Sequence, residues 1–169
     1  MSTGVLFVCT GNICRSPTAE GVFKAMAERE GIAVDVDSAG TYGGHAGEPP
    51  SKLAVEAAAR RGYDLSDLRA RLLRAEDVAR FDYVLAMDRG HLRVLRRMAP
   101  QAVSQRPRLF MNFAPALKID EVPDPWGGAR SVYERALDLI EAGCKGLLKH
   151  VTMEAAKGSS GGSGGGSER

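Results

Sequence analysis

The stretch VLFVCTGNICRSPTAE, residues 5–20, contains a predicted strand, a predicted helix and the polar turn between them. Its apolar first residues, together with Gly4, predict a strand over residues 4–9 that is buried on both faces, because the run is short and continuously apolar. A helix is predicted over residues 17–30, where Pro17 suits the first turn and apolar side chains recur on one face. The stretch therefore predicts a buried strand that enters a helix through a short polar loop.

The remainder of the chain repeats this alternation of strands and helices. Further strands are predicted over residues 33–38, 81–87 and 108–113, and further helices over residues 51–61, 75–80, 88–98 and 131–150. The pattern predicts an α/β domain with a mainly parallel sheet covered by helices on both faces. Ligands bind beyond the carboxyl ends of the strands in such folds, so the loop after the first strand is the expected site.

The overall composition is that of an ordinary single domain with a hydrophobic core. The chain has 169 residues, 44% of them hydrophobic and 26% charged, and a formal net charge of +2. This balance gives no support for a nucleic-acid or membrane-surface partner. No apolar run approaches the roughly 18 residues of a membrane span, and the first apolar run is too short for a secretory signal.

Cysteines and histidines are few and scattered along the chain. They are Cys9, Cys14, Cys144, His45, His91 and His150. An odd and sparse set of cysteines is not a disulfide framework and suits a reducing cytoplasm. The histidines show no metal-ligand spacing with the cysteines, so they are predicted to be surface residues, and no metal or other cofactor is expected.

The C-terminal segment KGSSGGSGGGSER differs in composition from the rest of the chain. Glycine- and serine-rich segments cannot form a core, so residues 158–169 are predicted to be a flexible tail with the composition of an added linker. The folded domain is expected to comprise residues 1–157.

The loop between the first strand and the first helix has the residue types of an anion-binding site. A short turn from a strand into a helix aims several backbone N–H groups at one point, and the positive end of the helix dipole adds to their effect. Gly11 permits backbone conformations that other residues resist, and Asn12 is one of the few other residue types that tolerate them. Arg15 can clamp an oxyanion with two parallel donors. The loop is therefore a candidate cradle for phosphate or a similar tetrahedral oxyanion.

Cys9 lies at the mouth of this predicted cradle, where the same dipoles and Arg15 favour a thiolate. A thiolate beneath a bound phosphate can attack phosphorus, and Ser16 can donate a hydrogen bond to the sulfur. A cysteine and an arginine at this spacing also arise readily by chance, and the alternative is a buried structural Cys9 beside a solvated Arg15. The strand before the loop, the glycine and asparagine within it and the Ser-Pro start of the helix favour the cradle.

A phosphoryl transfer also needs a group that protonates the leaving oxygen, and Asp124 in VPDPWGG suits that task. Its flanking prolines stiffen the loop, and Trp126 offers an apolar wall that favours a protonated carboxyl group. On its own, an aspartate before proline is more often an ordinary turn residue. Together with the cysteine loop, Asp124 is predicted to be a catalytic acid.

The motifs CTGNICRSPTAE and DPWGG together closely resemble the low-molecular-weight protein tyrosine phosphatases of the bacterial type. VDSAGT, GEPP and FDYVLAMD are also similar to that family, and the resemblance runs from Gly4 to Val151. It implies a three-layer α/β fold with a four-stranded parallel sheet and helices on both faces. It also implies hydrolysis of phosphotyrosine, with Cys9 as the nucleophile that forms a cysteinyl-phosphate, Arg15 as the phosphate clamp and Asp124 as the general acid and later the base.

The resemblance assigns further roles around the loop. Asn12, Ser16 and Ser38 match polar residues that hold the loop and tune the thiolate. Cys14 matches a cysteine that pairs reversibly with Cys9 under oxidation, and the alternative for Cys14 is a small buried filler. The residues expected to contact the substrate are Thr10, Gly11, Asn12, Ile13, Cys14, Ser16, Tyr42 and Trp126.

Two positions depart from the pattern of the family. Leu68 stands where relatives often carry a histidine, which removes a polar group expected to brace Asn12. Gly44 stands where many bacterial relatives have an aromatic residue. Tyr42 is predicted to form the pocket wall instead, and the alternative is that Tyr42 is only a mobile loop residue. Trp126 is the better candidate for stacking on a substrate ring.

Two other enzymes of the same fold are the alternatives to a tyrosine phosphatase. Arsenate reductases need further cysteines soon after the third strand, and the only later cysteine is Cys144, which is expected in the core of the last helix. Protein-arginine phosphatases tend to place threonine at the position of Ile13, whose size suits a flat phenol. The expected ligands are a phosphotyrosine protein or aryl phosphate, and phosphate or vanadate, bound by a monomer or weak dimer. The basic helix over residues 88–98 is expected to be a solvated face, with docking of acidic phosphoproteins as the alternative.

Overall fold

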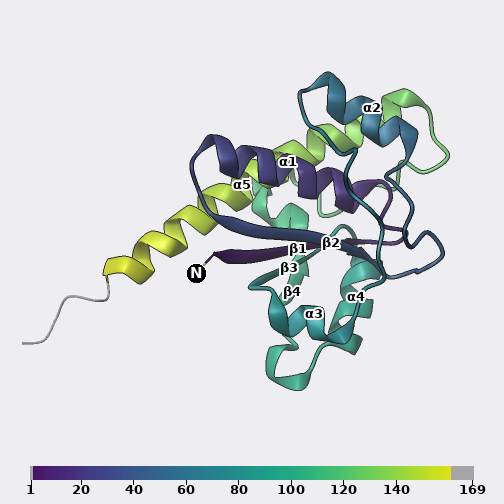
Figure 1. Cartoon of the computed structure of the whole chain (residues 1–169). Coiled ribbons are helices and arrows are strands. Elements are labelled where there is room, and N and C mark those ends of the chain that lie inside the picture. The colour runs from purple at the N-terminus through teal and green to yellow at the C-terminus, as the bar shows by residue number, and fades with distance from the viewer. Residues whose placement is uncertain (1, 161–169) are drawn as a thin grey trace, which may run out of the picture.

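The computed structural model of the chain describes residues 2–160, and their strands form one parallel sheet (Figure 1). The strands are β1 (Thr3–Cys9), β2 (Val34–Gly40), β3 (Tyr83–Ala86) and β4 (Pro107–Leu109). They lie in the order β2-β1-β3-β4, and each neighbouring pair is parallel. The predicted four-stranded parallel sheet is confirmed.

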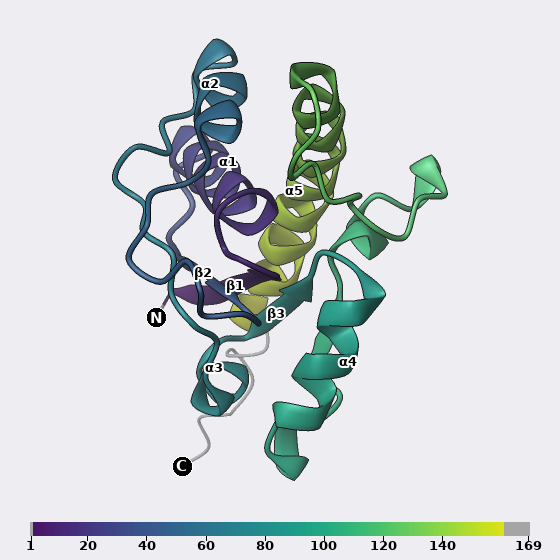
Figure 2. The ribbon, with the colours of Figure 1, turned by 90° about the vertical axis from the view of Figure 1, so that its right-hand side faces the viewer.

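Helices cover both faces of this sheet and complete three layers (Figure 1). The helices are α1 (Arg15–Arg29), α2 (Lys52–Arg60), α3 (Ala75–Arg80), α4 (Arg89–Met98) and α5 (Arg130–Ser160). Figure 2 shows α1 and α5 on one side of the sheet with α2 beside them, and α3 and α4 on the other side. The predicted α/β class is therefore confirmed. No helix within residues 2–160 is long and apolar enough to cross a lipid bilayer.

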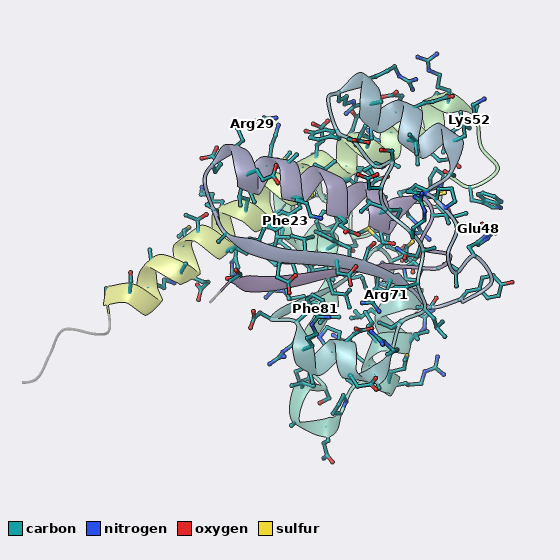
Figure 3. The ribbon with its side chains drawn as sticks, in the orientation of Figure 1. Phe23, Arg29, Glu48, Lys52, Arg71 and Phe81 are labelled. Atoms are coloured by element: carbon teal, nitrogen blue, oxygen red, sulfur yellow. The ribbon has the colours of Figure 1, made fainter. Side chains whose placement is uncertain are left out.

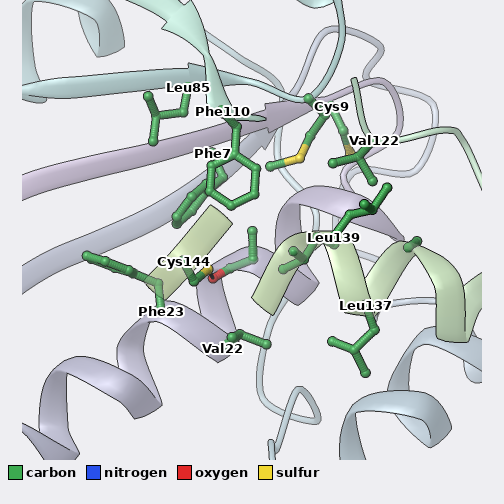
Figure 4. Packing of buried hydrophobic residues seen from close by; sticks show 14 of the residues in the cluster. Phe7, Cys9, Val22, Phe23, Leu85, Phe110, Val122, Leu137, Leu139 and Cys144 are labelled. Carbon is green, nitrogen blue, oxygen red and sulfur yellow. Dashed lines mark hydrogen bonds between the residues drawn. The ribbon is translucent and has the colours of Figure 1, made fainter. Parts of the chain in front are cut away.

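β1 is apolar along nearly its whole length because its two faces pack into two different hydrophobic clusters. Val5, Phe7 and Cys9 belong to the cluster that includes residues of α1 and α5, whereas Leu6 and Val8 belong to the cluster that includes residues of α3 and α4. Successive side chains of a strand point to opposite faces, so a strand between two clusters needs apolar residues throughout. Cys9 therefore lies on the α1 side of the sheet, in the same cluster as Phe7 (Figure 4).

The strand predicted over residues 108–113 is wrong for its last four residues. β4 is only three residues long, and Phe110–Phe113 form a 3-10 helix. Phe110 and Phe113 both lie in the cluster beneath α1 and α5, where Phe110 meets the ring of Phe7 edge-on with 5.4 Å between centroids. Residues three apart point to opposite faces in a strand but share a face in a 3-10 helix. The chain leaves the sheet so that both rings reach one cluster.

The last helix is longer than predicted. α5 continues past residue 150 to Ser160, because Val151 is still buried in the core and residues 153–157 are good helix formers. The hydroxyl groups of Ser159 and Ser160 also donate to carbonyl groups one turn earlier. The first three residues of the predicted tail, 158–160, belong to this helix. The rest of the predicted tail, 161–169, lies outside the described residues.

The order of the strands brings the carboxyl ends of β1 and β3 together. After β1 the chain enters α1, and after β3 it enters α4, whose N-cap residue is Asp88. β2 and β4 flank this pair on opposite sides, so the strand order reverses between β1 and β3, where ligands bind in folds of this class. In Figure 3, Glu48 lies at this end of the molecule and Arg29 lies at the opposite end.

Candidate active site

A pocket of about 200 Å³ opens where β1 ends. It is lined by Cys9, Thr10, Gly11, Ile13, Cys14, Arg15, Tyr42, His45, Asp124 and Trp126. Of the predicted site residues, Asn12, Ser16 and Ser38 do not line it and are buried beneath it. The fold thus brings Asp124 and Trp126 to the cysteine loop from a distant part of the sequence.

The loop between Cys9 and Arg15 leaves a row of backbone N–H groups without partners. The carbonyl groups of Cys9, Thr10 and Ile13 accept hydrogen bonds from backbone N–H groups at 2.7–2.9 Å. In contrast, the N–H groups from Gly11 to Cys14 donate to no group within residues 2–160. Successive free N–H groups at the start of a helix bind anions. The loop therefore has the backbone arrangement of an oxyanion cradle.

Asn12 is the residue of the loop that adopts the left-handed conformation, with φ of 57°. Its buried side chain holds this turn, because Nδ2 donates to Oγ of Ser16 at 2.8 Å and to Oγ of Ser38 at 2.9 Å. Its Oδ1 accepts the backbone N–H of Arg71 at 2.9 Å. Gly11 supplies space, since a Cβ there would lie 2.9 Å from Cδ2 of His45. Asn12, and not Gly11, is thus the loop residue with a positive φ.

The Sγ of Cys9 lies 2.9 Å from the Oγ of Ser16, and both side chains are buried. Ser16 Oγ already accepts a hydrogen bond from Asn12, so its own hydrogen remains for donation to the sulfur. The hydroxyl of Ser16 is therefore a hydrogen-bond donor to the sulfur of Cys9.

Arg15, the first residue of α1, is a buried cation with only part of its guanidinium in use. It is 3% exposed, and Nη1 donates to Oδ2 of Asp88 and to the carbonyl of Val122, both at 2.9 Å. Nε has no hydrogen-bond partner within residues 2–160, and Nη2 lies 3.8 Å from Oδ2 of Asp124. A buried donor without a partner costs free energy, so Nε is a group that an oxyanion in the pocket would satisfy, and Nη2 beside it could supply a second donor.

Asp88 orients Arg15 through this ion pair. Burial acts to raise the pKa of Asp88, but the backbone N–H of His91 and the guanidinium of Arg15 outweigh burial and leave that pKa below its usual value. Asp88 is therefore ionised near neutral pH. Sequence reasoning missed its role, although Asp88 is the last residue of the motif FDYVLAMD.

Asp124 faces the cradle from the proline-flanked loop that precedes α5. Its side chain is 52% exposed, and Oδ2 lies 3.8 Å from Nη2 of Arg15. Its other oxygen, Oδ1, accepts the backbone N–H of Trp126 at 3.1 Å. A carboxyl group that reaches both the ligand pocket and water can exchange protons with a leaving group and with water in turn.

Three aromatic rings, those of Tyr42, His45 and Trp126, wall the mouth of the pocket. His45 lies between the other two, with ring centroids 6.1 Å from Tyr42 and 5.9 Å from Trp126, and its Nδ1 lies 2.7 Å from Oε2 of Glu48. Sequence reasoning missed His45, because a histidine in a glycine-rich loop carries no periodic signal. A Cβ on Gly44 would lie 2.2 Å from the ring of Tyr42, so Tyr42 fills the space beside Gly44, the position at which many bacterial relatives have an aromatic residue.

The polar residues beneath the loop form a chain of hydrogen bonds that does not need a polar side chain at position 68. Leu68 packs against the core, and Asn12 is braced by the backbone N–H of Arg71 instead. Below Asn12, the hydroxyl of Ser38 donates to Oε1 of Glu20 at 2.6 Å, and burial raises the pKa of Glu20. Sequence reasoning missed Glu20, because the polar partner of a buried carboxyl group depends on which strand lies opposite.

Cys14 is a buried thiol at the back of the loop. Its Sγ lies 3.3 Å from the Oγ of Ser51 and 3.6 Å from the hydroxyl of Tyr133, and burial raises its pKa. All three cysteines are free, so the reversible pairing of Cys14 with Cys9 stays a prediction. Cys144 is fully buried in the core, as expected.

The prediction that the histidines are surface residues is wrong for His91. It is 4% exposed, and its Nε2 lies 2.8 Å from Oγ1 of Thr10. His91 shares the buried face of α4 with Leu95, one helical turn later. That spacing is a signal from which its burial could have been predicted.

Comparisons with known proteins agree on one family. Residues 4–157 match the family described as low molecular weight phosphotyrosine protein phosphatase. A low molecular weight protein-tyrosine-phosphatase from Streptomyces coelicolor is 44% identical over 156 residues, which cover 89% of this chain and 94% of that protein. The crystal structure of YfkJ from Bacillus subtilis is similar, with a TM-score of 0.86 and 35% identity, over 91% of this chain and 97% of that one. Wzb from Vibrio vulnificus, solved in complex with benzylphosphonate, has a TM-score of 0.78 and 27% identity, over 89% of this chain and 99% of that one.

Proposed function

Since the chain belongs to the low molecular weight phosphotyrosine protein phosphatase family, we propose that its pocket hydrolyses phosphotyrosine through a cysteinyl-phosphate intermediate. The activity class, a phosphoric monoester hydrolase of the protein tyrosine phosphatase type, follows from that membership. The proposed roles are Cys9 as nucleophile, Arg15 as phosphate clamp and Asp124 as general acid and base. The observation that carries them is the row of free N–H groups in the loop after Cys9, with two available donors of Arg15 beside it.

In the first step the thiolate of Cys9 attacks phosphorus, and the bond between phosphorus and the phenolic oxygen breaks. The free N–H groups and Nε and Nη2 of Arg15 bind the non-bridging oxygens, where negative charge is spread in the transition state. Asp124 enters this step protonated and gives its proton to the leaving oxygen, so that a neutral phenol departs. The product on the protein is the phosphorylated sulfur of Cys9.

In the second step water replaces the sulfur at phosphorus. The carboxylate of Asp124 takes a proton from the water as it attacks, and the bond between phosphorus and sulfur breaks with its electron pair on Cys9. The hydroxyl of Ser16, 2.9 Å from that sulfur, stabilises the departing thiolate. Inorganic phosphate is released, and Asp124 is again protonated for the next cycle.

The proposed ligands are a phosphotyrosine protein or another aryl phosphate, with phosphate and vanadate as inhibitors. The rings of Tyr42, His45 and Trp126 offer faces and edges to a phenol ring, which aromatic groups pack against favourably. The benzylphosphonate bound to Wzb, which also joins an aromatic ring to a phosphorus oxyanion, supports this assignment. Ile13 is an apolar part of the pocket lining, which suits a flat phenol.

The remaining parts of the proposal concern the whole chain. A cytoplasmic location is supported by the three free cysteines, which suit a reducing compartment. A domain over residues 1–157 is supported by the end of the family match at residue 157. We further propose a monomer or weak dimer that uses no cofactor and no nucleic-acid or membrane partner.

The purified protein is expected to hydrolyse phosphotyrosine peptides and p-nitrophenyl phosphate in the presence of a chelator, with inhibition by vanadate. Phosphoarginine should turn over at least roughly a hundredfold more slowly than phosphotyrosine, because Ile13 suits a flat ring. Arsenate should be reduced at least as slowly, because Cys144 is too buried to relay a disulfide. Release of phosphate and formation of arsenite are measured on one preparation. A kcat/KM for phosphoarginine equal to that for phosphotyrosine would contradict the assigned substrate.

The variant Asp124→Asn is expected to lower kcat/KM for phenyl phosphate by roughly 10²- to 10³-fold, because the phenolate must then leave without a proton. The loss for p-nitrophenyl phosphate should be much smaller, since nitrophenolate is a stable anion. A plot of log kcat/KM against the acidity of the leaving phenol should become steeper in the variant. Asp120→Asn is the matched control, because Asp120 pairs with Arg89 at the surface. Equal slowing of both substrates by Asp124→Asn would count against the acid role.

A further inference from the structure

His91 is a buried histidine that the proposed reaction does not use. It is 4% exposed on α4, and its Nε2 lies 2.8 Å from Oγ1 of Thr10. Thr10 directly follows Cys9 in the chain and lines the pocket. His91 therefore holds the side chain of a cradle residue that adjoins the nucleophile.

The same histidine contacts the carboxylate that orients Arg15. The backbone N–H of His91 donates to Oδ1 of Asp88 at 3.1 Å, and its Nδ1 lies 3.1 Å from that oxygen. The other oxygen of Asp88, Oδ2, accepts from Nη1 of Arg15 at 2.9 Å. One residue thus connects the start of the cradle with the phosphate clamp.

The imidazole is neutral, and Asp88 decides its tautomer. The charged groups that face His91 are Asp88, Arg15, Asp124 and Glu121. Burial outweighs the carboxylates and lowers the pKa of His91 to about 4. Nδ1 lies 3.1 Å from Oδ1 of Asp88 without the geometry of a hydrogen bond, and that carboxylate would repel a lone pair on Nδ1, so it favours a hydrogen there. Nε2 is then an acceptor, and the hydroxyl of Thr10 donates to it.

We propose that His91 is a positioning residue of the phosphate cradle, which holds Thr10 and Asp88 in the geometry that binds the oxyanion. The proposal rests on the proposed function, because the oxyanion is the phosphate of that reaction. With its hydroxyl held by His91, Thr10 is kept at the mouth of the cradle. Without the imidazole, Thr10 is free to rotate, whereas the backbone N–H at position 91 still donates to Asp88. Phosphate binding and kcat/KM should then weaken together.

Three substitutions separate the two contacts of the imidazole. Glutamine can place an amide group near the position of Nε2, asparagine can place one near Nδ1, and leucine fills the site without a polar group. His91→Leu and His91→Asn are expected to weaken the binding of inorganic phosphate by roughly three- to tenfold, and His91→Gln should recover most of that loss. Arg93→Ala, on the exposed face of α4, is the control and should leave the affinity unchanged. The Gln and Asn variants still decide the outcome if the Leu variant does not fold.

A double-substitution cycle tests whether His91 acts through Thr10. Thr10→Val removes the hydroxyl but keeps the shape of the side chain, so His91→Leu should cost little further affinity in that background. An equal cost in both backgrounds, or a Gln variant no better than the Leu variant, would overturn the proposal. Phosphate is titrated by calorimetry into proteins that also carry Cys9→Ser, so this readout does not depend on turnover. Hydrolysis that survives Cys9→Ser would refute the proposed reaction, but the titration would still show whether His91 positions the phosphate cradle.

Discussion

Replacing Cys9 with serine is expected to abolish the hydrolysis of p-nitrophenyl phosphate while leaving the binding of inorganic phosphate intact. The loss of a nucleophile removes the covalent route, so kcat should fall by roughly four orders of magnitude or more. Binding should survive, because its donors are the backbone N–H groups of the loop and the guanidinium of Arg15, none of which the substitution removes. Steady-state kinetics measure the first effect and calorimetric titration of phosphate measures the second.

A matched control for this variant is Cys144→Ala, which removes a thiol that is fully buried in α5 and does not line the pocket. It is expected to lower the free energy of unfolding by about 1–2 kcal/mol through a small cavity and to leave kcat/KM unchanged. Acid quenching during turnover should trap a phosphorylated cysteine in the control and none in Cys9→Ser. Substantial hydrolysis by Cys9→Ser would reject the cysteinyl-phosphate route.

The variant Arg15→Lys is expected to lower kcat/KM by roughly two to three orders of magnitude, although the positive charge is kept. The guanidinium bonds to Asp88 and Val122 through Nη1 and still presents Nε and Nη2 to the pocket. A lysine ammonium is a single point donor and cannot hold that anchor while it offers two parallel donors to phosphate. The main loss should be in kcat, because two parallel donors match the arrangement of the non-bridging oxygens in the transition state better than in the bound substrate.

Kinetics for phenyl phosphates and inhibition by vanadate measure this loss, and vanadate should also bind more weakly to the lysine variant. Arg93→Lys makes the same chemical change on the exposed face of α4 and should alter neither quantity. If Arg15→Lys retained kcat within a few-fold of the unmodified protein, two-pronged clamping would be excluded as a source of rate.

Most of the fold was predictable because its elements carry local patterns. The apolar run of β1 is continuous because both faces of the strand are packed. The apolar residues of α1 recur at helical spacing because only one face of that helix is packed. The failed strand after β4 shows the limit of such patterns. Phe110 and Phe113 have the composition of a strand, but their common cluster required a 3-10 turn. The end of α5 was missed because helix-forming residues carry it beyond the last buried position, Val151.

The cradle was predictable for a different reason. Residues of one short loop are close in space wherever that loop lies, so a cysteine, an asparagine and an arginine between a strand and a helix suffice to indicate an anion site. The left-handed turn at Asn12 agrees with the backbone tolerance of that residue type. Asp124 could be linked to the loop only because the reaction needs an acid and because the DPWGG motif resembles a known family.

The sequence by itself determined the parallel α/β sheet and the loop between Cys9 and Arg15, since both depend on neighbours in the chain. The tertiary structure alone decided which polar groups meet this loop from elsewhere: Asp88 and His91 after β3, Glu20 beneath Ser38, and His45 beside Gly11. Their partners depend on the adjacency of β1 with β3 and β2, which no local periodicity encodes. A buried polar side chain must find its partner across that adjacency, so its role becomes visible only when the strands are in place.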